Sequence, residues 1–344
     1  MSDKNFEERN TLIDLARPIA ATMIIMIHFS EGSKILTAMS NSIDRLAVPF
    51  FMLITVYFTF KNTNVEQLTR EELWKTVKKP INTLIHIWFF WTCCYLPLIL
   101  IVERGQDTAH IIFLLIMSIV GGEPIFVGSW YLGALIICLS MLPMILPVIK
   151  IKGLYILSIS ILIILLSIET YNFWITGNGV LIDISNNINF EATFLVGFIW
   201  ITTGLAIIKY NKSINFKINT IVIIFLVNLF MLLIEYGFAH VFHLMNSASL
   251  QIMLVPTVFW GFIVLLRLKQ PKVNNDFLFF LQRISALMFF IQFGVREVFY
   301  MLKINGNGIL TFIEALVIII VISFLCIRIR DSKKMTQFIN FFVR

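Results

Sequence analysis

The sequence has few charged residues for its length, and that shortage decides the class of protein. Asp, Glu, Lys and Arg together make up 14% of the 344 residues, whereas hydrophobic residues make up 58% and the mean hydropathy is +0.88. A typical soluble domain carries about 25% charged residues, which excludes a water-soluble fold for this chain. Its long apolar runs predict a polytopic membrane protein.

Cysteine and the common cofactor motifs are equally scarce. The four cysteines, Cys93, Cys94, Cys138 and Cys326, lie in apolar runs without metal-ligand or redox spacing, and we interpret them as packing residues. Glycine-rich phosphate loops, dinucleotide-binding fingerprints and calcium loops are absent from the sequence, and no metal site is expected. The net charge of +7 is spread over loops beside the apolar runs, so it does not predict nucleic-acid binding.

Ten apolar runs approach or reach the length of about 20 residues that a membrane-crossing helix needs. They lie near residues 11–30, 43–60, 80–102, 129–149, 153–169, 191–208, 218–240, 249–267, 277–300 and 307–327. An eleventh run, 110–120, is shorter, and we expect it to be re-entrant or interfacial. The sequence therefore predicts an all-α integral membrane protein with about ten transmembrane helices.

The positive residues predict how these helices are oriented, because Lys and Arg collect in cytoplasmic loops. With ten crossings, most of the 27 Lys and Arg residues fall on the same side as both chain ends, so we expect cytoplasmic N- and C-termini. The polar opening shows no cleavable signal peptide. The basic tail after residue 327 is short, so residues 1–344 are expected to form one membrane domain without an appended soluble domain.

The first apolar run carries three ionisable residues, which are costly inside a membrane unless they serve a site. Arg17 and His28 are eleven residues apart, so on a helix they share one face and lie about 16 Å apart along the axis. Asp14 precedes Arg17 by three residues and is placed to pair with it. Alternatively, Arg17 extends to the inner head groups and His28 is an interfacial aromatic residue. The shared face favours a functional site.

Three stretches of the sequence resemble the membrane acyltransferase-3 family. IDLARPIAATMIIMIH (13–28) resembles its first-helix signature, RLAVPFFMLITVYF (45–58) its second helix, and GSWYLGALI (128–136) its Trp-Tyr-Leu entry to a later helix. The resemblance implies a bacterial cell-membrane enzyme that moves an acyl group, usually acetyl, from cytoplasmic acyl-CoA to a hydroxyl of an extracytoplasmic or lipid-linked glycan. Acyl-CoA is then a donor substrate, and no permanently bound cofactor is expected.

The resemblance also implies roles for the residues of the first run. His28 would be catalytic, and we favour a general base acting on the acceptor hydroxyl, with a transient acyl-histidine left open. Arg17 would hold a phosphate or the pantetheine end of the donor, and Asp14 would orient Arg17. Arg45, at the entry to the second helix, would stabilise an oxyanion or contact an anionic acceptor, unless it is only interfacial.

Other aromatic and polar residues are weaker candidates for the same site. Trp130 and Tyr131 are placed to stack on a sugar ring or acyl group near the outer surface, although interfacial aromatic residues show the same pattern. His86 either lines the entrance for the donor or packs against a neighbouring helix. Arg296 and its neighbour Glu297 point to different helix faces, so we expect separate partners for them.

The sequence departs from the family pattern at several polar positions. Thr55 and Val56 replace a common Ser-Gly pair, and Gly128 and Ser129 stand where many members have a histidine. Gln292 follows Phe289 where the family often shows a tyrosine followed by a histidine. These replacements leave the acceptor open.

Two further functions remain as alternatives. Glu235 has no evident partner in its apolar run and would be a proton site in a transporter or exporter of a small or lipid-linked substrate. A non-catalytic descendant of the family is the other alternative, which the replaced positions favour. The retained Arg17 and His28 favour the enzyme.

Overall fold

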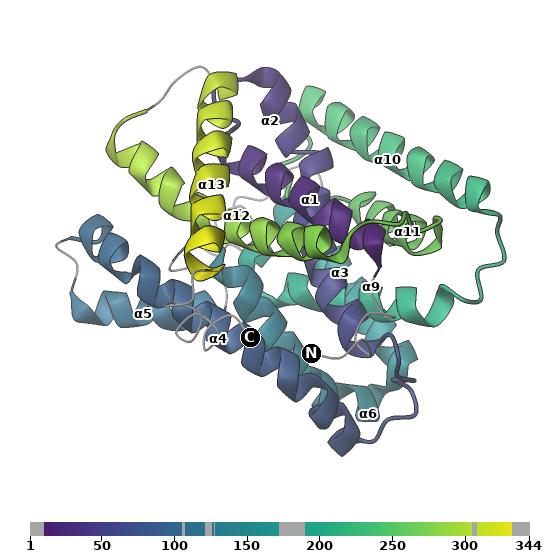
Figure 1. Cartoon of the computed structure of the whole chain (residues 1–344). Coiled ribbons are helices and arrows are strands. Elements are labelled where there is room, and N and C mark those ends of the chain that lie inside the picture. The colour runs from purple at the N-terminus through teal and green to yellow at the C-terminus, as the bar shows by residue number, and fades with distance from the viewer. Residues whose placement is uncertain are drawn as a thin grey trace.

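The computed structural model describes residues 10–104, 107–120, 126, 128–171, 190–304 and 308–331, and among these it contains helices and no strand (Figure 1). The elements in chain order are α1 (Thr11–Phe29), α2 (Lys34–Ser40), η2 (Ile43–Leu46), α3 (Ala47–Phe60), α4 (Arg70–Val102), α5 (Thr108–Val120), α6 (Ser129–Leu165), η3 (Leu166–Thr170), η4 (Phe190–Ala192), α9 (Phe194–Tyr210), α10 (Ile218–Val241), α11 (Leu254–Arg267), α12 (Asn275–Met301) and α13 (Gly308–Asp331). The prediction of an all-α fold is confirmed for this part of the chain.

Within the part of the chain that the structure describes, seven helical stretches are long and apolar enough to cross a membrane by length and composition. They are Thr11–Phe29, Lys34–Phe60, Arg70–Val102, Ser129–Thr170, Ile218–Val241, Asn275–Met301 and Gly308–Ile329. The helices α9 and α11 are apolar but shorter. The chain is therefore a multi-pass membrane protein, whereas the count of ten crossings and the side of the termini stay predictions.

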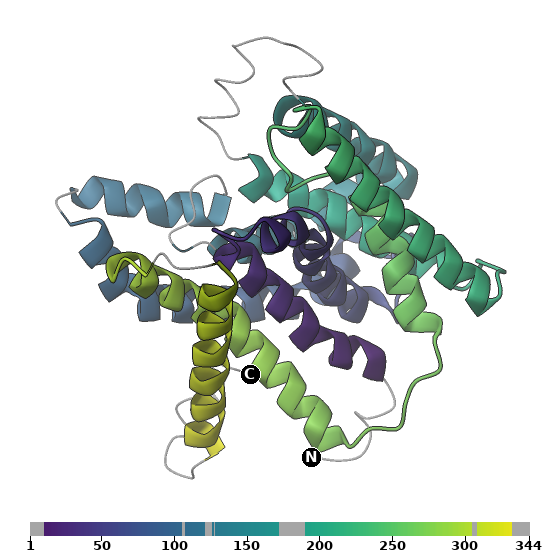
Figure 2. The same ribbon diagram turned by 90° about the horizontal axis from the view of Figure 1, so that it is seen from above.

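The peripheral helices leave their apolar side chains uncovered. Only 11% of the most apolar stretch of α10 and 17% of that of α13 is buried, and both helices lie at the edge of the bundle (Figures 1 and 2). Such exposure is unfavourable in water and suits contact with lipid. The short α5, on the run that we expected to be re-entrant or interfacial, has 13 residues, fewer than a crossing needs.

The helix α6 reverses direction at Lys150. This residue has φ 57° and ψ 174°, which are not helical values. Cys138, before the break, donates to a carbonyl at the start of α9, and the ring of Tyr155 lies 6.4 Å from a ring at the end of α9. Glu169 then accepts from an amide just before α9 begins. The two halves of α6 therefore run in opposite directions along α9, in agreement with two separate apolar runs.

The helices α1 and α12 lie side by side and run in the same direction (Figures 1 and 2). Near their starts, Gln282 of α12 donates a hydrogen bond to Asp14 of α1. Near their ends, the rings of His28 and Phe293 lie 5.5 Å apart in an edge-to-face arrangement. A buried apolar cluster of α1, α12 and α13 holds this pair together, and it includes Ile25, Ile291 and Ile319. The parallel pair positions Arg17, His28, Gln282 and Arg296 of the candidate site described next.

Candidate functional site between α1 and α12

The predicted pairing of Asp14 with Arg17 is present. The helix α1 begins at Thr11 because the side chain of Asn10 accepts a hydrogen bond from the amide of Ile13, and this cap places both ionisable residues in the first two turns. Arg17 Nε lies 3.2 Å from Asp14 Oδ1, and only 1% of the Asp14 side chain is exposed.

The helix α12 supplies a second partner for this carboxylate. Gln282 donates its Nε2–H to the same Asp14 oxygen at 2.7 Å. A buried carboxylate needs such partners to offset its desolvation. The two contacts fix the carboxylate, and the carboxylate in turn fixes the guanidinium of Arg17.

Arg17 faces a cavity of about 620 Å³ between α1, α3, α4, α6 and α12. We name it the inner cavity, and the pocket of His28 the outer pocket, after the topology that the sequence predicts. The inner cavity falls in the size range of small-molecule sites, about 300–1,000 Å³. Tyr131, hydrogen-bonded to Thr55, forms part of its wall. The other polar lining residues include Lys79, Thr59, Thr76, Thr83, Gln282 and Ser285. The inner cavity thus combines two basic side chains, Arg17 and Lys79, with hydroxyl and amide groups and a set of phenyl rings.

His28 lies in a second pocket at the opposite end of α1. This outer pocket has a volume of about 290 Å³ and is also lined by Arg296, Glu31 and Tyr300. The guanidinium groups of Arg296 and Arg45 both act electrostatically on His28. A site with two guanidinium groups near an imidazole is suited to stabilise negative charge that develops on an oxygen atom.

Arg45 reaches this region from η2, at the entry to α3. Its Nη1 donates to Ser249 Oγ at 2.9 Å, and its Nη2 donates to Asn41 Oδ1 at 3.1 Å. These two neutral partners help to orient the guanidinium. The predicted role of Arg45, at an oxyanion or an anionic acceptor, stays a prediction.

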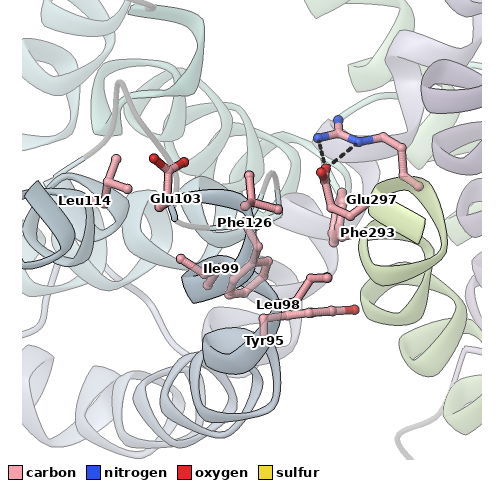
Figure 3. A pocket seen from close by; sticks show the side chains of 10 residues that line it. Tyr95, Leu98, Ile99, Glu103, Leu114, Phe126, Phe293 and Glu297 are labelled. Carbon is pink, nitrogen blue, oxygen red and sulfur yellow. Dashed lines mark hydrogen bonds and ion pairs between the residues drawn. The ribbon is translucent and has the colours of Figure 1, made fainter. Parts of the chain in front are cut away.

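Arg296 and Glu297 form an ion pair with each other, so the expectation of separate partners is wrong. Arg296 Nη2 lies 2.7 Å from Glu297 Oε1, and Nε lies 3.2 Å from the same oxygen. Long side chains let residues that are adjacent on a helix meet beyond its surface. The pair borders a third pocket of about 180 Å³, in which Tyr95 and Phe126 lie toward Phe293 (Figure 3).

The aromatic and histidine candidates fall in different places. Tyr131 is 8% exposed, and its ring lies 5.4 Å from that of Phe289, so it belongs to the inner cavity. Trp130 is half-buried and packs against the apolar core instead. His86 is exposed, and its Nδ1 lies 2.6 Å from the carbonyl oxygen of Asn82 in its own helix. Neither Trp130 nor His86 lines the inner cavity or the outer pocket.

Glu235 is not without partners, which corrects the expectation of an uncompensated carboxylate. Its Oε1 accepts from the amide of Ile252 at 2.7 Å and from the hydroxyl of Tyr171, and its Oε2 accepts from the amide of Met253 at 2.8 Å. Both amides come just before α11, where a negative charge interacts favourably with the helix dipole. Glu235 therefore caps α11, and this contact explains an acidic residue in an apolar run.

Gly128 has no side chain because Phe293 occupies the space that one would need. A Cβ atom at residue 128 would lie 2.2 Å from Phe293 Cε2, far inside van der Waals contact. The ring of Phe293 is also the ring that meets His28 edge to face. A side chain at residue 128 and the ring of Phe293 therefore exclude one another in this packing arrangement.

Sequence analysis missed several residues of the site that lie on α12. Residues of α12 recur at alternating spacings of three and four, which is the period of one helix face. This stripe consists of Gln282, Ser285, Phe289, Gln292, Arg296 and Phe299. Gln282 and Ser285 line the inner cavity, and Arg296 lines the outer pocket. The polar members of the stripe were the signal that would have found Gln282 and Ser285.

Comparison with known proteins gives a family for this arrangement. A family model described as an acyltransferase domain, of the acyltransferase-3 type, matches residues 10–328. A serine/alanine racemase of Enterococcus gallinarum is 24% identical over an aligned length of 350 residues. The match covers 94% of this chain and 46% of the racemase. The chain thus spans about half the length of that curated relative. No solved structure matches the chain.

Proposed function

Because the chain belongs to the acyltransferase-3 family, we propose that it is a membrane acyltransferase that moves an acetyl group from cytoplasmic acetyl-CoA to a glycan hydroxyl. The acceptor would be extracytoplasmic or linked to a lipid, and the enzyme would act in the cell membrane of a bacterium. Membership of the family and the multi-pass helical fold are the established part. The donor, the acceptor and the roles of individual residues are the proposal.

One observation carries the proposal, namely that the two ends of α1 lie in different pockets. Arg17 lines the inner cavity and His28 lines the outer pocket. Eleven residues of helix separate them, or about 16 Å. An enzyme with a donor on one side of the membrane and an acceptor on the other needs two such openings on one axis.

The inner cavity supports binding of acyl-CoA. Arg17 presents a planar, permanently charged group that suits the phosphates of a nucleotide. Lys79, on the α4 wall, adds a second positive charge, and no described carboxylate pairs with it. The phenyl rings further in provide an apolar path for the pantetheine arm.

His28 supports the chemistry at the outer end. As a general base it would take the proton of the acceptor hydroxyl while the hydroxyl oxygen attacks the thioester carbonyl carbon. The carbon–sulfur bond then breaks, and the proton passes to the leaving thiolate to give free CoA. Arg296, which lines the same pocket as His28, and Arg45 would stabilise the oxyanion that forms in between.

The test is the release of free CoA from acetyl-CoA by the purified protein in nanodiscs. We expect slow release by the wild type and a loss of about 100-fold or more for His28→Ala, since general-base catalysis contributes about 10²–10⁴-fold. His86→Ala is the matched control, because His86 is exposed and bonds only within its own helix. Full activity of folded His28→Ala would contradict the assigned role. Absence of release by the wild type would instead favour the transporter or non-catalytic alternative.

A further inference from the structure

Because α1 and α12 run parallel and side by side, the positions of their residues along the helix axis can be compared directly. Asp14 contacts Gln282, and His28 shares the outer pocket with Arg296, the same number of residues further along each helix. Gln292 precedes Arg296 by four residues, so it lies about 6 Å toward the inner cavity along the axis. Gln292 therefore stands between the two openings.

Two phenyl rings separate the inner cavity from His28 at this depth. Phe289 lines the inner cavity, and Phe293 packs edge to face against His28. Their ring centroids lie 5.9 Å apart at an interplanar angle of 88°, and the side chains are 6% and 3% exposed. A thioester bound near Arg17 must pass these rings to reach His28.

Gln292 carries a buried hydrogen-bond acceptor at the same depth. The residue is 0% exposed, and its Nε2 donates to the carbonyl of Phe289 at 2.9 Å. Its Oε1 is buried and accepts no hydrogen bond from any residue that the structure describes. Exchanging the amide oxygen and nitrogen would not help, because Oε1 would then face the Phe289 carbonyl. A buried acceptor in this state costs free energy that a donor group would recover.

The turn of α12 that carries Gln292 makes two hydrogen bonds with a side chain of α4. The hydroxyl of Tyr95, from α4, donates to the carbonyl of Phe290 at 2.5 Å and accepts from the amide of Gly294 at 3.3 Å. In a regular helix that amide would donate directly to that carbonyl. These two contacts hold this turn of α12 against α4, so the position of Gln292 along the axis is set by α4 as well as by α1.

We propose that Gln292 Oε1 accepts the N–H of the amide nearest the thioester in the pantetheine arm of the donor. This assignment rests on the proposed function. In the arm, a sulfur and two methylenes separate the thioester carbonyl carbon from that amide nitrogen, roughly 5 Å when extended. The depth of Gln292 relative to the outer pocket, about 6 Å, matches this separation. A thioester placed at His28 thus brings its amide to Gln292, and the rest of the arm extends toward Arg17. Gln292 is a positioning residue in this arrangement.

The experiment compares two small thioester donors on the full chain in nanodiscs. S-acetyl-N-acetylcysteamine has the amide N–H, and the thioester made from 2-mercaptoethyl acetate has an ester oxygen in its place. Release of free thiol gives kcat/KM for each donor. We expect the wild type to prefer the amide donor by about tenfold, the effect of one neutral hydrogen bond. In Gln292→Leu, and in Gln292→Met as a second apolar variant, we expect the preference to fall to about one.

The ester donor separates positioning from a merely structural role. We expect its kcat/KM to change little in the two variants and their unfolding midpoints not to fall, since an unsatisfied buried acceptor has been removed. An equal loss for both donors, or a wild type with no preference, would overturn the assignment to Gln292. A wild type that releases thiol from neither donor nor from acetyl-CoA would overturn the proposed function and this assignment with it.

Discussion

Arg17 is held by a fixed carboxylate, and this contact determines what a substitution there will do. Asp14 lies 3.2 Å from Nε of Arg17 and is itself bound by Gln282 at 2.7 Å. The guanidinium is therefore oriented before any ligand arrives. Preorganised groups bind with less entropic cost than mobile ones.

Arg17→Lys is expected to weaken binding of acetyl-CoA about tenfold rather than to preserve it. Lysine keeps the charge but lacks the planar fork that can contact Asp14 and a phosphate at the same time. Equilibrium titration with acetyl-CoA measures this loss. Arg70→Lys, at the exposed start of α4, is the matched control and should bind like the wild type.

Gly128→Ala is expected to destabilise the protein by about 1–3 kcal/mol, the usual cost of overpacking. The added methyl group would lie 2.2 Å from Phe293, and the ring would have to move toward His28. Thermal unfolding in detergent measures the loss. The double variant with Phe293→Ala supplies the control, because the extra cost of Gly128→Ala should disappear there. Additive effects would contradict the packing explanation.

At this scale the sequence predicted contacts within a helix and missed those between helices. Asp14 and Arg17 are three residues apart, so helix geometry alone predicts their pairing. Gln282 was not predicted as their partner because nothing local says which helix packs beside α1. The expectation for Glu235 was wrong for the same reason, since its partners are amides of another segment, at Ile252 and Met253.

At the scale of the helical element, the reversal in α6 depends on one residue with a positive φ. Lys150 has φ 57° and ψ 174°, a region that is essentially reserved for glycine. Lys150→Gly is therefore expected to stabilise the protein by about 1 kcal/mol. Lys152→Gly, in the helix just after the break, is the control and should destabilise it by about 1 kcal/mol. Unfolding midpoints of the same sign for both variants would contradict this explanation of the turn.

Glu235 accepts hydrogen bonds at the start of α11. A substitution there can show whether this residue is a helix cap or a proton site. Glu235→Gln removes the charge and one of the acceptor atoms, and we expect a loss of about 1–3 kcal/mol in unfolding free energy. The rate of CoA release per folded molecule should stay unchanged, because Glu235 does not line the inner cavity or the outer pocket. A normal unfolding midpoint with a lost activity would favour a role in proton movement.

At the scale of the whole molecule, the sequence predicted which segments are helices but not their order in space. Apolar composition is visible in any window, whereas the parallel register of α1 and α12 follows from packing of Ile25, Ile291 and Ile319 in a three-helix cluster. That register is what joins Arg17, Gln292 and His28 into one axis. The shared helix face of Arg17 and His28 could be predicted from the sequence. That these two residues open into two different pockets could not.

The most direct test of the central claim is equilibrium binding of acetyl-CoA to the wild type, Arg17→Ala and His28→Ala in nanodiscs. The account places donor binding at Arg17 and the reacting groups at His28, at opposite ends of α1. It predicts that Arg17→Ala weakens binding at least tenfold, about 1.4 kcal/mol, while folded His28→Ala binds like the wild type. Equal affinities for the wild type and Arg17→Ala, or a loss of binding only in His28→Ala, would contradict it.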